Sequence, residues 1–299
     1  MFGKVKKILA AILCLVCLCS CGVKRAENNG KIKVVTTVFP LYDFVRAVGG
    51  DRVDITLLIK PGTEVHTYDP KSSDIKAIYD CDLFLYIGGE SEEWVNTLLA
   101  DLDVKTVRMM DCVDTIHHEH HDHEDDEHIW TSPENAALMV ERICDELCEG
   151  DGKNTSAYRE NAEEYIKRIN EADGKIKDIV KQSGDPFILV ADRFPFSYFA
   201  EHYGIDYAAA FGGCAVSTDI SIKVMSELIK VCKEKGVEYV YHTELSNKNI
   251  ASALGEQIGV KLLELHSAHN VTLDDFNDNI TYVDIMYRNC DALKEGMNQ

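Results

Sequence analysis

The chain has 299 residues, a formal net charge of −20, 45% hydrophobic residues and eleven cysteines. Such an acidic surface disfavours nucleic acid and anionic lipid head groups and concentrates cations near the protein. The length and apolar content suffice for a large core or two lobes. Seven cysteines follow residue 21 at scattered spacing, which predicts buried small apolar residues rather than a disulfide framework.

The N-terminus predicts an export signal. Three lysines precede an apolar run, residues 8–18, that is too short to span a bilayer comfortably. The run ends in Leu-Cys-Ser-Cys-Gly, which resembles a bacterial lipobox and makes Cys21 the expected lipidation site. We predict a signal peptide over 1–20, a tether over 21–30 and an extracytoplasmic protein anchored to the cell membrane by lipid. A retained membrane anchor is the alternative.

The next part of the chain alternates short β-branched or apolar runs with amphipathic stretches. This alternation predicts an α/β fold with mainly parallel sheets. A serine in capping position and a proline after it predict a helix from 133 to about 148. The earlier expected strands are 33–38, 53–59, 83–87 and 106–109, and the helices between them are 40–48, 72–79 and 92–99.

Apolar residues at spacings of three and four between residues 156 and 181 predict one long amphipathic helix. We therefore expect an N-terminal lobe over 31–150, a linking helix over 155–182 and a C-terminal lobe over 185–299. In the second lobe the expected strands are 187–191, 207–211, 239–242 and 261–265, with helices at 196–203, 222–235, 247–258 and 282–294.

Residues 117–128 hold six histidines and six carboxylates with no apolar side chain. Neutral imidazoles offer lone pairs to a transition metal, and the carboxylates lower the local potential. The composition favours metal contact over an incidental acidic loop. The histidines expected to gather zinc weakly from the loop over 117–127 are His117, His118, His120, His121 and His123.

Metal-capable side chains also follow the expected strands in both halves. In open α/β sheets, ligands bind beyond the carboxyl ends of the strands. Each such residue alone has an ordinary explanation, such as a surface histidine or a helix cap. Together they predict a metal cleft shared between the lobes. They are His66, Asp192, Glu244 and His266.

Several spaced motifs resemble the zinc and manganese solute-binding lipoproteins of bacterial ABC importers, with ordered matches from about residue 33 to 296. The motifs include Pro61-Gly62-x-x-x-His66-x-Tyr68-x-Pro70, Gly88-Gly89-x-x-Glu92-x-Trp94, His128-Ile129-Trp130-x-Ser132-Pro133 and Phe196-Ser197-Tyr198-Phe199-Ala200. The resemblance implies two α/β lobes joined by one long rigid helix, with the metal in the cleft between them. It also implies an acidic His-rich loop in zinc-specific members.

Carried over by motif, the ligands of that family fall on His66 and His128. The family usually has a histidine where this chain has Arg193, and an arginine cannot coordinate because its guanidinium has no acceptor. The acidic ligand of the family aligns with His266, although Glu264 or His269 lies only a small shift away.

The expected metal site is therefore His66, His128 and His266, with Asp192 or Glu244 as oxygen donor. Three imidazoles and one oxygen suit Zn²⁺, whereas the alternative, Mn²⁺, prefers more oxygen. The implied function is a monomeric receptor that hands metal to an ABC importer permease.

No H-E-x-x-H occurs in the His-rich tract, which argues against a zincin protease, and we expect no enzyme activity. An extracytoplasmic zinc hydrolase and a surface adhesin or metal buffer are the alternatives.

Overall fold

The computed structural model describes residues 30–116, 125–213 and 220–297. Residues Ile32–Gln299 form one compact unit. The signal peptide, Cys21 and the five loop histidines expected to gather zinc all lie outside the described residues. Among the residues that are described, no helix is long and apolar enough to cross a bilayer.

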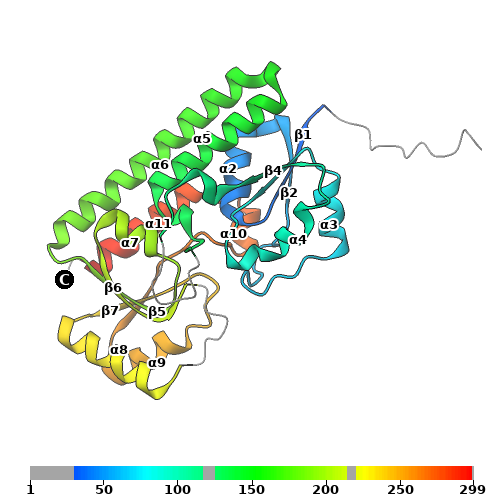
Figure 1. The fold of residues 1–299 in the computed structure, drawn as a ribbon. Coiled ribbons are helices and arrows are strands. Elements are labelled where there is room, and N and C mark those ends of the chain that lie inside the picture. The colour runs from blue at the N-terminus through cyan, green and yellow to red at the C-terminus, as the bar shows by residue number, and fades with distance from the viewer. Residues whose placement is uncertain (1–29, 117–124, 214–219, 298–299) are drawn as a thin grey trace, which may run out of the picture. The chain divides into compact units, whose positions relative to one another are not determined.

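The unit contains two four-stranded sheets in which every described strand pair is parallel (Figure 1). This confirms the predicted α/β fold with mainly parallel sheets. The first sheet has the order β2-β1-β3-β4, from β1 (Ile32–Thr36), β2 (Val53–Leu57), β3 (Leu83–Tyr86) and β4 (Lys105–Arg108). The second has the order β6-β5-β7-β8, from β5 (Phe187–Phe194), β6 (Asp206–Gly212), β7 (Tyr239–His242) and β8 (Lys261–Glu264).

Helices flank both sheets, as the predicted βα alternation requires. In chain order they are α2 (Phe39–Gly49), α3 (Ser72–Tyr79), α4 (Asn96–Leu99), α5 (Pro133–Gly150), α6 (Thr155–Ser183), α7 (Ser197–Tyr203), α8 (Ile222–Lys235), α9 (Asn249–Ile258), α10 (Leu273–Asn277) and α11 (Tyr282–Met297). Short 3₁₀ helices occur at η1 (Gly50–Arg52), η2 (Glu90–Val95), η3 (Met109–Cys112), η4 (Ile129–Thr131) and η5 (Gly152–Asn154).

The long helix predicted near residues 156–181 is α6, which has 29 residues. Its buried side chains recur at spacings of three and four, so they form one apolar stripe. That stripe packs against α2 and α5 from the first half and against α7 and α11 from the second. Figure 1 shows α6 continuing from beside α2 to beside α7. The helix therefore links the two sheets through a shared core.

Two features of the chain differ from the predicted elements. The first half of the helix expected over 92–99 belongs to the 3₁₀ helix η2, and only the second half, α4, is α-helical. The five-residue helix α10 was not predicted because it is too short to show a helical period. Its main sequence signal is the N-cap residue Thr272, whose side chain accepts from Asp275 N.

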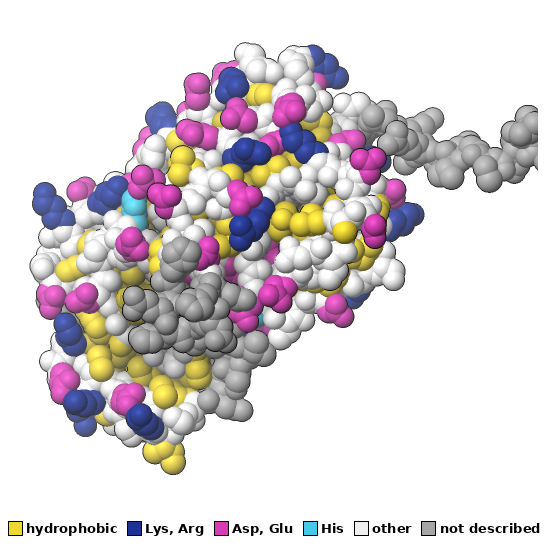
Figure 2. Space-filling model, in the orientation of Figure 1, with side chains coloured by type: hydrophobic (Ala, Val, Ile, Leu, Met, Phe, Trp, Pro, Cys, Tyr) yellow, Lys and Arg dark blue, Asp and Glu magenta, His cyan; other side chains and the backbone are white. Residues whose placement is uncertain are grey.

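The described cysteines are all free. The prediction of burial is confirmed for four of them and only partly met by Cys112 and Cys148, which are half-buried. On the face shown in Figure 2, acidic and basic side chains are interspersed.

Parallel strands send their following loops to one edge of each sheet. The loop after β2 carries His66, the segment between β4 and α5 carries His128, and the loop after β8 carries His266 and His269. The fold therefore directs chain segments that are far apart in sequence to the predicted site.

Candidate metal centre

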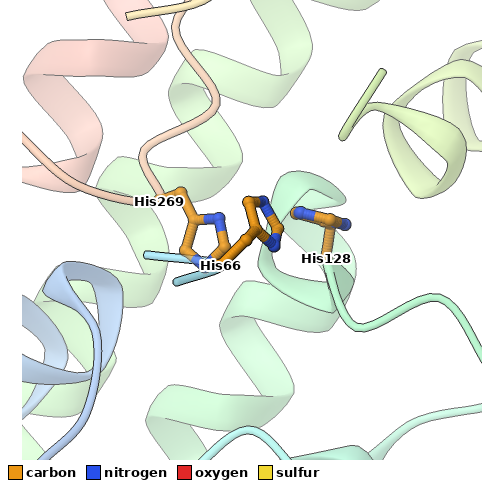
Figure 3. A group of neighbouring side chains, drawn as sticks. All are labelled: His66, His128 and His269. Atoms are coloured by element: carbon orange, nitrogen blue, oxygen red, sulfur yellow. The ribbon is translucent and has the colours of Figure 1, made fainter. Parts of the chain in front are cut away.

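Three histidines converge at the loops that follow β2, β4 and β8. His66, His128 and His269 each offer one ring nitrogen, and these nitrogens all lie within 4.8 Å of one another. Their ring centroids are 5.1 to 5.7 Å apart, and Figure 3 shows the three rings gathered together from separate chain segments. The arrangement is that of a set of ligands around one ion, since lone pairs of neutral imidazoles are the usual donors to transition metals.

His128 is held in one orientation by a carboxylate. Its Nδ1 donates to Asp126 Oδ1 at 2.8 Å, and its backbone N–H donates to the same oxygen at 2.9 Å. The opposite nitrogen, Nε2, is buried and has no hydrogen-bond partner among the described residues. Metal-binding histidines commonly pair their second nitrogen with a carboxylate in this way, which fixes the tautomer. The geometry therefore leaves Nε2 as the donor atom.

The surroundings shift the pKa values of the three imidazoles in different directions. Burial lowers the pKa of His66 to about 4, with the charges of His128 and Arg193 acting in the same direction. Burial also brings the pKa of His269 well below its usual value, again assisted by His128. Burial alone would lower the pKa of His128, but the charge and hydrogen bond of Asp126 outweigh it and raise that pKa. Two of the three rings are therefore neutral donors at physiological pH.

Hydrogen bonds between the loops hold the cluster together. Gly62 N donates to Val271 O at 2.8 Å, and Asn270 Nδ2 donates to Thr63 O at 2.8 Å, so the loops of His66 and His269 are joined. Trp130 Nε1 donates to Ser267 O at 2.8 Å and joins the His128 segment to the same loop. The ring of Trp130 also packs against His269, with centroids 4.7 Å apart. These contacts hold the three metal-capable nitrogens near one another.

His266, which sequence reasoning placed in the cluster, lies elsewhere. Its Nδ1 accepts from Ala268 N at 2.9 Å, and its backbone N–H donates to Asn289 Oδ1 on α11 at 2.8 Å. Between it and His269, Ala268 has a φ of 61°, in the left-handed region that turns the chain sharply. The structure therefore brings His269, the alternative three residues on, to the position expected for His266.

The two predicted oxygen donors are occupied with other hydrogen bonds. Asp192 accepts from Arg193 N at 2.8 Å and from Thr243 Oγ1 at 3.1 Å, one bond to each oxygen. Glu244 accepts from Ser267 N at 2.7 Å with one oxygen and from His269 N at 3.2 Å with the other. Neither joins the three nitrogens within 4.8 Å. Both carboxylates hold the loops that carry the cluster.

Arg193 pairs with a carboxylate at the cleft, that of Glu64. Its Nη1 lies 3.1 and 3.0 Å from the two carboxylate oxygens. Burial would raise the pKa of Glu64, but the hydrogen bond and charge of Arg193 hold it below its usual range. Glu64 in turn accepts from His66 N at 3.2 Å. A cleft of about 300 Å³, lined in part by these residues and His269, opens beside the cluster.

The residues present fit a transition metal. His66 Nδ1 and His128 Nε2 are buried atoms without hydrogen-bond partners in the part of the chain that is described. Buried polar atoms are nearly always satisfied in folded proteins, so two such nitrogens side by side call for a ligand. Imidazole suits zinc, copper, iron and nickel, whereas manganese and magnesium prefer oxygen.

Two parallel β-sheets flanked by helices, one long connecting helix and a histidine cluster on the loops after the strands define a two-lobe α/β protein with a candidate metal centre. The chain is more particularly a member of the ZnuA family, described as zinc-uptake complex component A, periplasmic, whose model matches residues 34–296.

Curated relatives agree with this membership. The zinc-binding lipoprotein AdcA of Streptococcus pneumoniae is 30% identical over 98% of this chain and 61% of its own length. The chain thus spans about 61% of the length of that relative. The high-affinity zinc uptake system protein ZnuA of Bacillus subtilis is 27% identical over 99% of both chains.

Solved structures share the fold. The Zn(II)-bound ZnuA-like domain of Streptococcus pneumoniae AdcA has a TM-score of 0.78 at 30% identity, covering 90% of this chain and 100% of that one. The metal-dependent lipoprotein YcdH of Bacillus subtilis has a TM-score of 0.80 at 28% identity, covering 89% and 100%.

Proposed function

We propose that this protein is an extracytoplasmic receptor that binds one zinc ion and delivers it to the permease of an ABC importer. The observation that carries the proposal is the convergence of His66, His128 and His269. Family membership and the zinc-binding names of the relatives support it. The ligand set comprises these three residues, with His269 in place of His266.

Zinc is the expected cargo because of the donor chemistry. Three imidazoles suit tetrahedral Zn²⁺ at Zn–N distances of about 2.0 to 2.1 Å. Manganese is the weaker alternative, since it favours oxygen-rich sites. The low pKa values of His66 and His269 keep two donors deprotonated, so protons compete little with the ion at neutral pH.

Binding is expected to be reversible capture rather than catalysis. The donors sit on loops from both halves of the chain, and hydrogen bonds such as Gly62 N to Val271 O join those loops. Release then requires the loops or lobes to shift, which breaks the ligand shell. A hydrolase would instead need a lasting open coordination position. The relatives' names describe zinc binding and uptake, which favours the receptor over an enzyme.

The proposed placement in the cell follows from the N-terminus. Cleavage after residue 20 would leave Cys21 for lipidation, and the tether over 21–30 would join the anchor to a monomeric two-lobe body, 31–299. The histidines of the 117–127 loop would gather zinc weakly. A lipoprotein among the relatives supports this assignment.

The proposal is tested by titrating the purified apo protein with zinc against a competing chelator. One tight site is expected. Replacing His66, His128 or His269 with alanine removes a ligand bond and should weaken the affinity at least about 100-fold, more than the usual loss from an outer-shell change. His202, which pairs with Asp173 away from the cluster, provides the matched control as His202→Ala. Absence of a tight site in the unmodified protein would refute the function.

A further inference from the structure

A buried carboxylate lies directly beside the three histidines. Glu127 is 2% exposed, and its Oε2 accepts from Ser91 N at 3.0 Å and from Ser91 Oγ at 2.9 Å. Its other oxygen, Oε1, is buried and has no hydrogen-bond partner among the residues that the structure describes. A buried carboxylate oxygen without a partner is costly, so this atom needs an explanation.

Glu127 is held in place by close contacts with Gly89 and Ser91. Gly89 lies so close that a Cβ on it would overlap Glu127 Cβ and Oε2. The backbone of Gly89 therefore passes where other residues could not, and the two bonds from Ser91 anchor one oxygen. Oε2 of Glu127 is therefore held by two hydrogen bonds, whereas Oε1 has no hydrogen-bond partner among the described residues.

The open oxygen faces the cluster. Glu127 Oε1 is 3.6 Å from His66 Nδ1, which is likewise buried and without a hydrogen-bond partner in the described ranges. This distance is too long for a hydrogen bond. Two donors on one tetrahedral zinc lie about 3.3 Å apart, given metal–ligand distances of about 2.0 to 2.2 Å. The separation therefore matches two ligands of the same ion.

We propose that Glu127 supplies the oxygen donor that completes the metal shell with His66, His128 and His269. The inference rests on the proposed zinc-binding function and deepens it. The group of atoms that all lie within 4.8 Å of one another comprises the three nitrogens without Glu127, so coordination by Glu127 would require its carboxylate to move toward them.

Charge gives an independent reason for this assignment. Three neutral imidazoles leave a buried dication with its full charge, and burying an uncompensated charge is strongly unfavourable. One carboxylate halves the net charge of the site. Asp192 and Glu244 already accept hydrogen bonds with both oxygens, and Arg193 has no acceptor. Unlike Asp192 and Glu244, Glu127 has a buried oxygen without a hydrogen-bond partner among the described residues.

The test uses the full protein with Glu127→Gln, which keeps the size of the side chain and an acceptor for Ser91 but removes the charge. The zinc affinity should fall at least about 100-fold, beyond the usual effect of an outer-shell residue. The visible spectrum of the Co²⁺ form should also change, since the donor set changes. The matched control is Glu90→Gln, which removes the same charge from an exposed neighbour and should leave both readouts unchanged.

The outcomes separate this inference from the proposed function. If Glu127→Gln binds zinc as tightly as the unmodified protein while His66→Ala does not, the inference is overturned and the function stands. If the unmodified protein has no tight site, the function itself fails. Should the variant not fold, a zinc-bound crystal structure decides: a Glu127 oxygen at about 2.0 to 2.2 Å from the ion supports the inference, and one beyond about 3 Å overturns it.

Discussion

His266 and His269 lie three positions apart on one loop and have different surroundings. His269 faces His66 and His128, while the Nδ1 of His266 accepts from Ala268 N. Both are buried, so burial does not distinguish them. The difference comes from where the chain turns, which brings only His269 into the histidine cluster.

We predict that His269→Ala weakens zinc binding at least about 100-fold, because a ligand bond is lost. His266→Asn should change the affinity less than about 10-fold, since an amide oxygen can accept from Ala268 N in place of Nδ1. A chelator competition assay measures both. The reverse ranking of the two variants would return His266 to the ligand shell.

Glu92 gives a pH-dependent prediction. It is fully buried, and burial raises its pKa to about 7 from an ordinary value of 4.5. The folded state therefore favours the protonated form: this contribution to stability is complete below about pH 4.5 and is lost as the pH rises through 7. Relative to the unmodified protein, Glu92→Gln should be more stable at pH 8 than at pH 5 by about 3 kcal/mol.

Urea unfolding at the two pH values measures this difference. Glu93→Gln, on an exposed neighbour, is the control and should show no such pH dependence. If the stability difference between Glu92→Gln and the unmodified protein is the same at pH 5 and pH 8, the buried carboxyl is not the cause.

The sequence predicts part of the candidate site because two of its histidines belong to spaced motifs. His66 and His128 are marked in this way, but their neighbours are not. Whether His266 or His269 joins the cluster depends on the positive φ of Ala268, which no residue pattern predicts. Glu127 lies in an acidic tract with five other carboxylates, and composition alone does not distinguish it from them.

At the scale of elements, three helices meet at one buried carboxylate. Asp43 on α2 accepts from Arg46 on the same helix, from Tyr165 Oη on α6 and from Tyr282 N at the start of α11. Burial raises the pKa of Asp43, opposed by the charge of Arg46 and by these hydrogen bonds. This residue links the first half, the long helix and the last helix.

Asp43→Ala should destabilise the protein by about 3 to 5 kcal/mol, because it leaves a charge and two donors unpaired. Urea denaturation measures the loss as a lower midpoint. Asp51→Ala, on the exposed 3₁₀ helix η1, serves as the control and should change stability by less than about 0.5 kcal/mol. Equal effects from the two variants would contradict the linking role of Asp43.

Most elements follow from local pattern, and the exceptions have local causes. The stripe of α6 repeats over 29 residues, so its period is unambiguous. By contrast, Glu92 lies in η2 with non-helical backbone angles where a helix was expected, and its side chain accepts from Gly88 N at 2.7 Å. This side-chain-to-backbone hydrogen bond joins residues four apart in sequence, and such local bonds compete with the helical backbone.

At the scale of the whole molecule, the proposed site is distinct from residues 117–124, which carry the five loop histidines. His66, His128 and His269, which form the cluster, all lie outside that segment. Deleting those eight residues should therefore leave one tight zinc site and remove only weaker zinc binding. Calorimetric titration distinguishes the two classes of site, and loss of the tight site would show that the tract, not the cluster, binds the ion.

We expect one zinc ion to bind between His66, His128 and His269. Anomalous diffraction at the zinc edge from crystals of the zinc-loaded protein tests this expectation. A single strong peak is expected about 2.0 to 2.1 Å from one nitrogen of each ring. A zinc peak centred on His266, or no peak among the three rings, would contradict it.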